Sequence, residues 1–238
     1  MAKIAIVGIC GKMGRRILNL AKEVSLEVVL GLESKDHPLA ENTIEGVKVV
    51  SDYSKISQAD CLIDFSSIQA TSECLNNALK YNKPVVIGTT GIDIAGQKRI
   101  KEASGKIAIV YSPNMSVGVN LLFKLIKEAS RILKGYEVNI EEAHHIQKKD
   151  SPSGTAKKLA EIINSAGFNI KIQDIKSVRK GDIIGDHKVI FESDTDKIEL
   201  IHQAKTRDIF AKGAVLAAKW VVGKPAGLYS MEDVLFKD

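Results

Sequence analysis

The first 114 residues alternate short apolar runs with stretches in which apolar residues recur at helical spacing. The runs predict β-strands, and the stretches between them predict the crossover helices of βαβ units. Because the runs are apolar without interruption, the strands should be buried on both faces, as in a parallel sheet. The predicted strands are residues 4–7, 28–32, 47–50, 61–65, 85–87 and 107–110, and the helical stripes are Met13, Ile17, Leu20, Ala21 and Val24, then Ala70, Cys74, Leu75 and Ala78.

The pattern changes after Asn114. Apolar positions from Leu121 to Leu133 have helical spacing, residues 137–143 are typical of a strand, and a further helix is expected to begin near Ser153. Residues 172–205 alternate as in a mixed or antiparallel sheet, which indicates a second, α+β domain. Residues 209–222 are helical again, and the tail over residues 223–235 has no core of its own, so we expect it to pack onto the first domain.

Composition excludes several classes of protein. The 238 residues are 45% hydrophobic and 26% charged, which is ordinary for a globular protein of one large or two modest domains. The three cysteines, Cys10, Cys61 and Cys74, form no CxxC pair, so neither a disulfide framework nor a cysteine-rich zinc site is expected. With no signal peptide and no membrane-spanning stretch, we predict a cytoplasmic protein without a membrane partner.

The net charge of +5 changes this picture little. Its lysines are spread along the chain and aromatic residues are scarce, so nucleic acid is not an expected partner. Solvated surface lysines account for most of the surplus, and an anionic small ligand explains it as well as nucleic acid does.

A glycine-rich loop, Gly8-Ile9-Cys10-Gly11-Lys12-Met13-Gly14, joins the first predicted strand to the first predicted helix. Glycine allows close backbone approach, and the amides at a helix start favour the pyrophosphate of a dinucleotide. The spacing is GxxGxxG rather than GxGxxG, so a tight structural turn stays an alternative. Glu33 strengthens the dinucleotide interpretation, because an acid at the end of the second strand commonly binds the adenosine ribose. Nearby Lys35 would tolerate a 2′-phosphate, which leaves both NAD and NADP open.

Two further loops should lie on the same side of the sheet. They are Gly88-Thr89-Thr90-Gly91 and Ser112-Pro113-Asn114-Met115, and each follows a predicted parallel strand. Ligands of open α/β sheets bind at the carboxyl ends of the strands. Each loop taken alone is as typical of a structural turn, but together they favour one nicotinamide cleft.

Residues 142–155 hold the richest chemistry, with His144, His145 and Lys148 ahead of a helix start at Ser153. A metal site is not expected, because adjacent side chains of a strand point to opposite faces and no HExxH spacing is present. Acid–base chemistry is favoured, since imidazole titrates near neutrality and an ammonium stabilises an anion. The exposed amides at Gly154 suit a carboxylate. A surface turn with satisfied histidines is the alternative.

The chain resembles the 4-hydroxy-tetrahydrodipicolinate reductase family, also called dihydrodipicolinate reductase, over nearly its whole length. The glycine loop and the block around His144 and Lys148 carry the likeness in the family's order. The further matching residues are Glu142, His145, Asp150, Pro152, Ser153, Gly154, Thr155, Ala156, Gly88-Thr89-Thr90-Gly91, Asn114, Ser116-Val117-Gly118-Val119-Asn120, Arg179, Gly181, Asp182, Gly185, His187, Arg207, Phe210, Ala211, Gly213, Ala214, Trp220, Gly223, Lys224, Gly227, Leu228 and Tyr229.

The resemblance implies an α/β fold with a Rossmann-like dinucleotide domain, residues 1–114 completed by 208–238. Residues 115–207 would form a mixed-sheet domain for substrate binding and oligomerisation, in a homotetramer. The implied reaction is NAD(P)H-dependent formation of tetrahydrodipicolinate in diaminopimelate and lysine biosynthesis. The implied catalytic residues are His144 and Lys148, with substrate contacts from His145, Gly154 and Thr155. The implied cofactor contacts are Gly8, Ile9, Cys10, Gly11, Lys12, Met13, Glu33, Gly88, Thr89, Thr90, Ser112, Pro113, Asn114 and Met115, without a metal.

Two positions depart from the family pattern. Many relatives have Arg after the ribose-binding acid, whereas this chain has Ser34, so we expect it to use NADH. Met115 stands where some relatives have an aromatic residue.

Two rival functions are a dehydrogenase acting on another amino-acid precursor, such as a semialdehyde, and a dinucleotide sensor without catalysis. Against the first, no cysteine accompanies the His144 segment as a nucleophile would.

Overall fold

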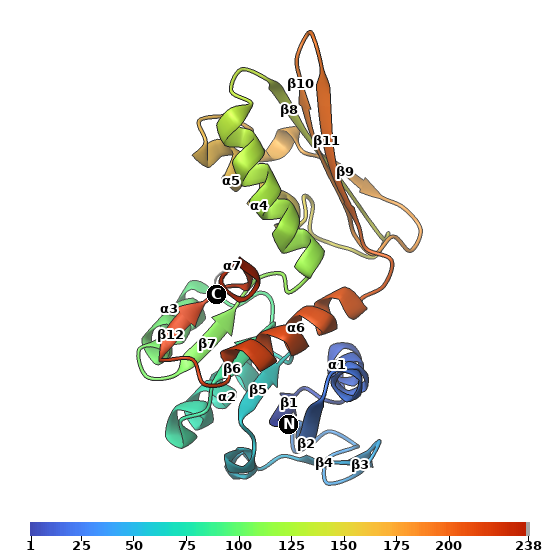
Figure 1. Ribbon diagram of the computed structural model, residues 1–238. Helices are drawn as coiled ribbons and strands as arrows, with labels where there is room; N and C mark the ends of the chain where they lie inside the picture. Colours follow the sequence, from blue (N-terminus) through green and yellow to red (C-terminus); the bar gives the residue numbers. More distant parts are fainter. Residues whose placement is uncertain (237–238) are drawn as a thin grey trace. The chain divides into compact units, whose positions relative to one another are not determined.

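The computed structural model describes residues 1–236, which form two compact units (Figure 1). The first unit comprises Met1–Ser116 and the segment that starts at Phe210, and the second comprises Val117–Ile209. Each unit has a sheet and an apolar core of its own. None of the helices in the described part of the chain has both the length and the apolar character to span a membrane.

The sheet of the first unit is parallel except for one edge strand, β3. Its order is β12-β7-β6-β5-β1-β2-β4-β3. All six strands predicted for this part of the chain are present, with ends shifted by at most two residues. The strands are β1 (Ala2–Val7), β2 (Leu26–Leu32), β3 (Thr43–Ile44), β4 (Val47–Val50), β5 (Cys61–Asp64), β6 (Val85–Ile87), β7 (Ala108–Tyr111) and β12 (Gly227–Tyr229).

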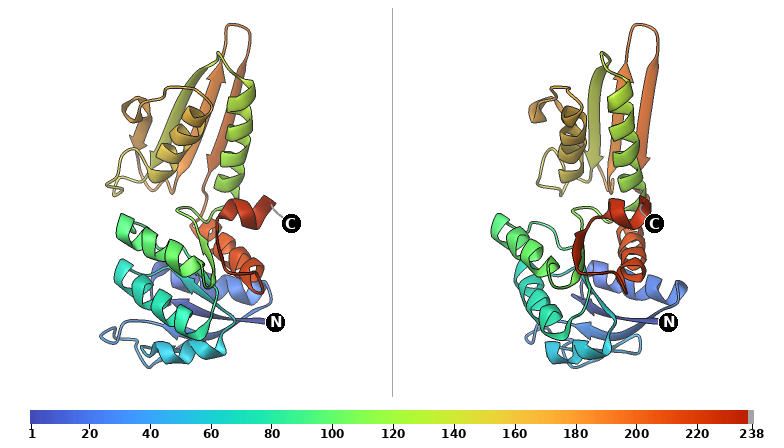
Figure 2. Two further views of the ribbon diagram at one scale, coloured as in Figure 1. Left: turned by 90° about the vertical axis from the view of Figure 1, so that its left-hand side faces the viewer. Right: turned by 60° about the vertical axis from the view of Figure 1, so that its left-hand side comes forward.

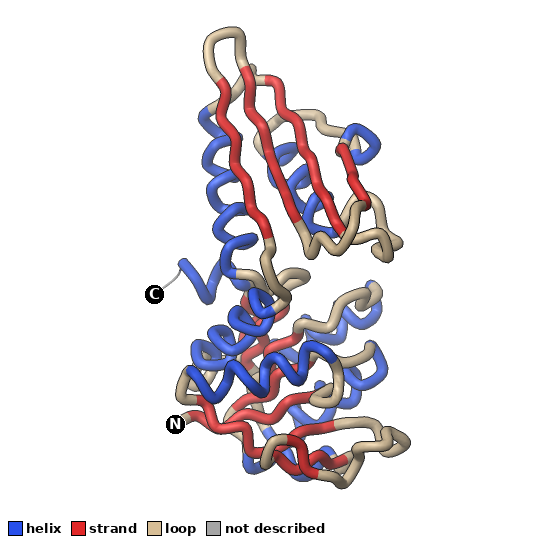
Figure 3. The backbone as a smooth tube through the Cα atoms, turned by 90° about the vertical axis from the view of Figure 1, so that its right-hand side faces the viewer, coloured by secondary structure: helices blue, strands red, loops and turns tan. Residues whose placement is uncertain are grey.

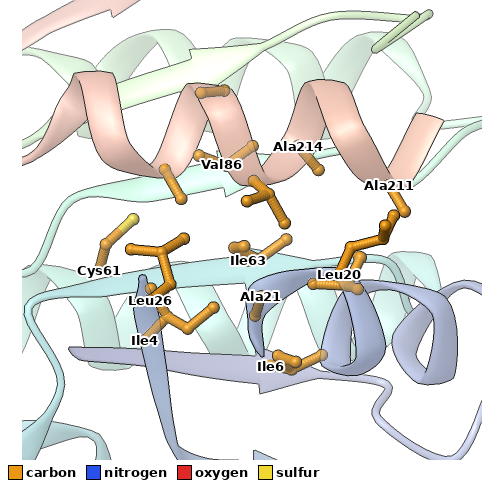
Figure 4. Close-up of a cluster of buried hydrophobic side chains, with 14 of the residues drawn as sticks. Ile4, Ile6, Leu20, Ala21, Leu26, Cys61, Ile63, Val86, Ala211 and Ala214 are labelled. Atoms are coloured by element: carbon orange, nitrogen blue, oxygen red, sulfur yellow. The ribbon is translucent and has the colours of Figure 1, made fainter. Parts of the chain in front are cut away.

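Helices cover both faces of this sheet, as unbroken apolar strands require. Alternate residues of β1 point to opposite faces: Ile4 and Ile6 pack with α1 (Lys12–Glu23) and α6 (Asp208–Val221). Figure 4 shows part of that core. Ala5 and Val7 pack instead with α2 (Ile68–Tyr81) and α3 (Ile94–Ser104). The 3₁₀ helix Tyr53–Gln58 joins the second core.

The tail after α6 belongs to the first unit. Its strand β12 pairs in parallel with β7 at the edge of the sheet. The following helix α7 (Met231–Phe236) buries Met231 and Val234 in the core shared with α1 and α6. The tail has no core of its own, and it is held on the first unit because these few apolar side chains are buried against distant segments of the chain.

The second unit is a four-stranded mixed sheet with two helices on one face (Figures 2 and 3). Its strand order is β11-β10-β8-β9, in which β8 and β9 are parallel and the other neighbours are antiparallel. The prediction of a mixed sheet is confirmed, although residues 172–174 form a 3₁₀ helix that precedes strand β9. The elements are α4 (Val117–Ile132), β8 (Glu137–His144), α5 (Gly154–Ser165), β9 (Lys176–Arg179), β10 (Asp186–Glu192) and β11 (Lys197–Gln203).

Candidate active site

The strand order places the predicted cofactor loops together, at the carboxyl ends of the parallel strands of the first sheet. Strands β2, β1, β5, β6 and β7 are parallel neighbours, so their carboxyl ends lie at the same edge. Glu33 and the loops over residues 8–14, 65–67, 88–91 and 112–115 follow these ends. This is the edge at which open α/β sheets bind ligands.

The backbone of the glycine loop is packed so tightly that a residue with a side chain does not fit at two of its positions. Gly8 has φ +80°, and a Cβ there would lie 2.6 Å from the Phe65 carbonyl oxygen. A Cβ on Gly14 would lie 2.2 Å from the Gly8 carbonyl oxygen. Gly11 caps α1 without any side-chain hydrogen bond, which leaves backbone amides at the positive end of the helix. The close contacts explain why the turn needs glycine at positions 8 and 14, and the amides at the helix start are the feature that would hold a phosphate group.

Glu33 lies against this loop, as expected of a ribose-binding acid. Its Oε2 accepts a hydrogen bond from the Cys10 amide at 3.2 Å, and its Oε1 accepts from the Ser34 amide at 3.1 Å. Burial and the neighbouring carboxylate raise the pKa of the Cys10 thiol. The Glu33 carboxylate is thus held by backbone amides at the strand end, which fits recognition of a sugar hydroxyl.

Donor atoms of Cys10, Glu33 and His37 lie within 4.8 Å of one another. These atoms already have partners in the polypeptide, however. Both Glu33 oxygens accept from amides, and His37 Nδ1 accepts from the Leu39 amide at 3.1 Å. The group is therefore better explained as an ordered loop at the carboxyl ends of the strands than as a metal site.

The other predicted cofactor residues differ in their exposure. Thr90, Pro113 and Lys12 are exposed, whereas Thr89 and Ser112 are buried. Ile9 and Met115 are buried in the core of the unit, and Met115 retains only 2% exposure. Any cofactor contact of Ile9 or Met115 is thus expected through the backbone rather than the side chain.

In the second unit, the carboxylate of Glu142 connects the predicted chemical residues. Its side chain is fully buried on β8. Arg179 binds it with both guanidinium ends, and the Ser153 amide donates to Oε1 at 3.2 Å. The Nδ1 of His144 forms a further short hydrogen bond with Oε2. Burial raises the pKa of Glu142, but the bonds from Arg179 and His144 outweigh it and leave the pKa lowered.

His144 is buried beside this carboxylate, with 7% exposure. Burial lowers its pKa, and Glu142 opposes that shift. Because Nδ1 is bonded to the carboxylate, Nε2 is the ring nitrogen that would exchange a proton if His144 acts as an acid or base. Glycine at position 185 keeps the surroundings of Nε2 open, since a Cβ there would lie 3.0 Å from that atom.

The start of α5 is fixed by Ser153. Its hydroxyl accepts a hydrogen bond from the Ala156 amide at 3.2 Å and so caps the helix, which confirms the predicted helix start at this residue. The same hydroxyl is 3.3 Å from Nε2 of His187, whose ring packs edge-on against His144. Gly154 is exposed, and a Cβ there would meet nothing within 4 Å. A carboxylate can therefore approach the amides at this helix start.

Lys148 and His145 lie in the turn between β8 and α5. Lys148 Nζ forms an ion pair with Asp150 at 2.7 Å and is mostly covered, with 22% side-chain exposure. His145 is half-buried, and its Nδ1 has no hydrogen-bond partner among residues 1–236. The turn thus carries a positive charge and an imidazole in the short segment between β8 and the start of α5, and anion binding by this segment stays a prediction.

The sequence did not identify Glu142, Arg179 or His187 as functional, although all three lie in the matching motifs. Arg179 follows Glu142 by 37 residues, and only the parallel register of β8 and β9, with His144 opposite Arg179, brings the pair together. His187 is opposite Glu142 on β10. The signal available for this cluster was an acid, Glu142, two positions before the candidate His144 on a predicted strand.

Comparison with known families decides the affiliation. The family model described as dihydrodipicolinate reductase, N-terminus, matches residues 2–115, and the model described as dihydrodipicolinate reductase, C-terminus, matches residues 118–235. The chain belongs to the dihydrodipicolinate reductase family. Its two matched halves follow the two units of the fold within a few residues at their junction near residue 116.

Relatives of this dihydrodipicolinate reductase family member agree over their full length. The 4-hydroxy-tetrahydrodipicolinate reductase of Syntrophus aciditrophicus is 40% identical, with 99% of this chain and 98% of the relative covered. That of Caldanaerobacter subterraneus is 39% identical, with 100% and 99% covered. Among solved structures, a dipicolinate-bound dihydrodipicolinate reductase from Paenisporosarcina sp. TG-14 has the same fold, with a TM-score of 0.82, 24% identity and 97% of each chain covered.

Proposed function

We propose that this chain is a 4-hydroxy-tetrahydrodipicolinate reductase, an NAD(P)H-dependent oxidoreductase that forms tetrahydrodipicolinate in diaminopimelate and lysine biosynthesis. The observation that carries the proposal is full-length identity of about 40% to reductases of that name. The polar cluster of Glu142, His144 and Ser153 supports it, because it combines an acid–base group with a carboxylate-binding helix start.

The cofactor is assigned to residues 1–114, completed by 208–238. Bound there, the nicotinamide nucleotide would supply the hydride. The glycine loop would hold its pyrophosphate and Glu33 its adenosine ribose, and Ser34 in place of an arginine supports use of NADH. The assigned contacts are Gly8, Ile9, Cys10, Gly11, Lys12, Met13, Glu33, Gly88, Thr89, Thr90, Ser112, Pro113, Asn114 and Met115.

The substrate is assigned to residues 115–207. It is a cyclic dianion with two carboxylates and a ring nitrogen, and the solved relative binds dipicolinate, a cyclic dicarboxylate of the same kind. Amides at Gly154 and Thr155 would bind one carboxylate, supported by His145. The positive charge of Lys148 lies in the same short segment and would stabilise the anion.

Proton transfer is assigned to His144 and Lys148. Hydride addition to a conjugated imine leaves an electron-rich enamine, which must take up a proton. His144 presents Nε2 for this transfer while Glu142 holds Nδ1. Arg179 balances the Glu142 charge, so that the carboxylate stays ionised and orients the ring.

We also infer a homotetramer that acts in the cytoplasm. Helices α4 and α5 leave one face of the second sheet open (Figure 3). The strand register places Val178 and Ile201 on that face, and they are 38% and 55% exposed. Apolar side chains on an open sheet face are typical of self-association. Cys10, Cys61 and Cys74 are free thiols, which suits a reducing compartment. Sedimentation of the purified protein tests the assembly.

A coupled assay tests the function. The hydroxylated precursor is made enzymatically, and oxidation of NADH and of NADPH is followed in separate reactions. Substrate-dependent oxidation with this precursor and none with semialdehydes is the expected result. Activity only with a semialdehyde would favour a different dehydrogenase, and NADH binding without turnover would favour a dinucleotide sensor.

A further inference from the structure

A second buried carboxylate, in the first unit, has no part in the function assigned so far. Asp64 ends β5 and is 0% exposed. A buried carboxyl group is costly unless hydrogen bonds satisfy it. The position is therefore one where an apolar residue would be expected on stability grounds, and the sequence indeed continues an apolar run through Leu62 and Ile63.

The carboxyl group of Asp64 joins the loop after β5 to the loop after β6. Its Oδ1 accepts a hydrogen bond from the Thr89 hydroxyl at 3.2 Å and a short one from the Ser66 hydroxyl. The Thr89 hydroxyl oxygen in turn accepts from the Ser66 amide at 3.0 Å. The Gly88 amide adds a backbone bond to the Asp64 carbonyl oxygen at 2.9 Å. These bonds form a closed network across the two strand ends.

Close packing extends the network to the glycine loop. A Cβ on Gly88 would lie 2.1 Å from Cζ of Phe65, so the ring fits only against glycine. The carbonyl oxygen of Phe65 is the atom that a Cβ on Gly8 would meet at 2.6 Å. Three loops at the same edge of the sheet are thus fixed to one another, and Asp64 lies beneath them.

We propose that Asp64 is a positioning residue for the dinucleotide, acting through the hydroxyls of Ser66 and Thr89. Its side chain is fully buried, so it would act on a ligand indirectly, through the hydroxyls that it holds at the strand ends. A loop that is already ordered loses less entropy when the cofactor binds, which increases affinity. The inference rests on the proposed cofactor site in the first unit and not on the identity of the substrate.

The acceptor oxygen, rather than a negative charge, is the feature that matters. Burial raises the pKa of Asp64, and the hydrogen bonds from Ser66 and other hydroxyls only partly oppose it. Oδ2 has no hydrogen-bond partner among residues 1–236, whereas Oδ1 has two. An amide, which keeps one acceptor oxygen in the same shape, should therefore replace the carboxyl group, and an aliphatic side chain should not.

The test compares Asp64→Asn with Asp64→Leu in the full-length protein. The dissociation constant for NADH is measured by its fluorescence, kcat is measured at saturating NADH, and folding is followed by circular dichroism and thermal melting. We expect Asn to keep the dissociation constant within about threefold and Leu to weaken it about tenfold or more, as loss of two hydrogen bonds implies. In both variants kcat should stay within about twofold, because Asp64 orders the free loops rather than the transition state.

Two hydroxyl variants keep the test decisive if the Leu variant does not fold. Ser66→Ala and Thr89→Val each remove one donor to Asp64, and each should weaken NADH binding about three- to tenfold. Ser104→Ala is the matched control, since the Ser104 hydroxyl is also buried but bonds to the Lys101 carbonyl within α3, away from the loops. It should leave NADH binding unchanged.

Unchanged NADH affinity in folded Asp64→Leu, or in both hydroxyl variants, would overturn the inference. Equal weakening by Asn and Leu would also overturn it, because the charge would then matter. These results differ from failure of the proposed function, in which the unmodified protein would bind NADH but leave the precursor unreduced. An unmodified protein that does not bind either nicotinamide nucleotide would overturn the cofactor assignment itself.

Discussion

Arg179 binds both carboxylate oxygens of Glu142, with Nη2 2.8 Å from Oε1 and Nη1 3.1 Å from Oε2. The two residues come from neighbouring parallel strands, and their pairing leaves Oε2 for His144 and Oε1 for the Ser153 amide. A bidentate pair fixes the carboxylate plane as well as its charge. The orientation of the proposed proton-transfer group and that of the helix start therefore depend on the same carboxylate.

Glu142→Gln should lower turnover and move the pH profile. Glu142 raises the pKa of His144 against the lowering by burial, so its removal should lower that pKa further. If protonated His144 is the donor, the rate falls as pH rises through this pKa, and the falling limb moves to lower pH. We expect kcat to drop about 10²-fold, the scale of a misplaced acid–base group, with NADH binding unchanged. A pH–rate profile identical to that of the unmodified enzyme would contradict the role.

Lys148→Ala should lose most turnover while still binding NADH. Lys148 is largely covered and lies in the segment assigned to the anionic substrate, and a positioned acid–base group contributes about 10²–10⁴-fold in rate. The measurement is steady-state turnover together with NADH binding. Lys149→Ala is the matched control, because Lys149 is the exposed neighbour and should be nearly neutral. Near-normal turnover in folded Lys148→Ala would remove Lys148 from the mechanism.

Much of this architecture follows from local patterns, and the rest depends on contacts between distant residues. The buried strands and the cap at Ser153 were predictable because apolar runs and capping residues act locally. The edge strand β12 was not, since its three residues gain their structure from pairing with β7 more than a hundred positions earlier. The pairing of Glu142 with Arg179 depends on strand register, which no local pattern specifies here.

The apolar run over residues 61–65 illustrates the same limit within the cofactor loops. Sequence patterns indicated a buried strand there and gave no role to Asp64. Its function as an acceptor appears only when β5 and β6 lie side by side and Thr89 comes within hydrogen-bond distance. The loop pattern likewise did not show that the Met115 side chain packs in the core, which leaves its backbone for the predicted cofactor contact.

His187 should make stability fall in acid. Burial lowers its pKa to about 3, from an ordinary value near 6.5. The folded state therefore keeps this ring neutral, and its contribution to stability is complete above about pH 6.5 and is lost as pH falls toward 3. Between about pH 7 and about pH 5 the loss is about 2 kcal/mol, and urea unfolding at both pH values measures it. His187→Gln should flatten this dependence; the same slope in that variant would contradict the assignment.

Ser34→Arg should shift the cofactor preference toward NADPH. Ser34 is exposed and directly follows Glu33, whose carboxylate is held by the Cys10 and Ser34 amides. A guanidinium at position 34 would bind a 2′-phosphate with two parallel hydrogen bonds, which the ammonium of Lys35 does not provide. The ratio of kcat/KM for NADPH to that for NADH should rise about tenfold or more, because a charge-assisted pair contributes more than a neutral hydrogen bond.

Ser34→Ala, which adds no charge, serves as the control and should leave the ratio within about twofold. An unchanged ratio in Ser34→Arg would mean that position 34 does not face the adenosine ribose, and the placement of Glu33 at that ribose would then need revision.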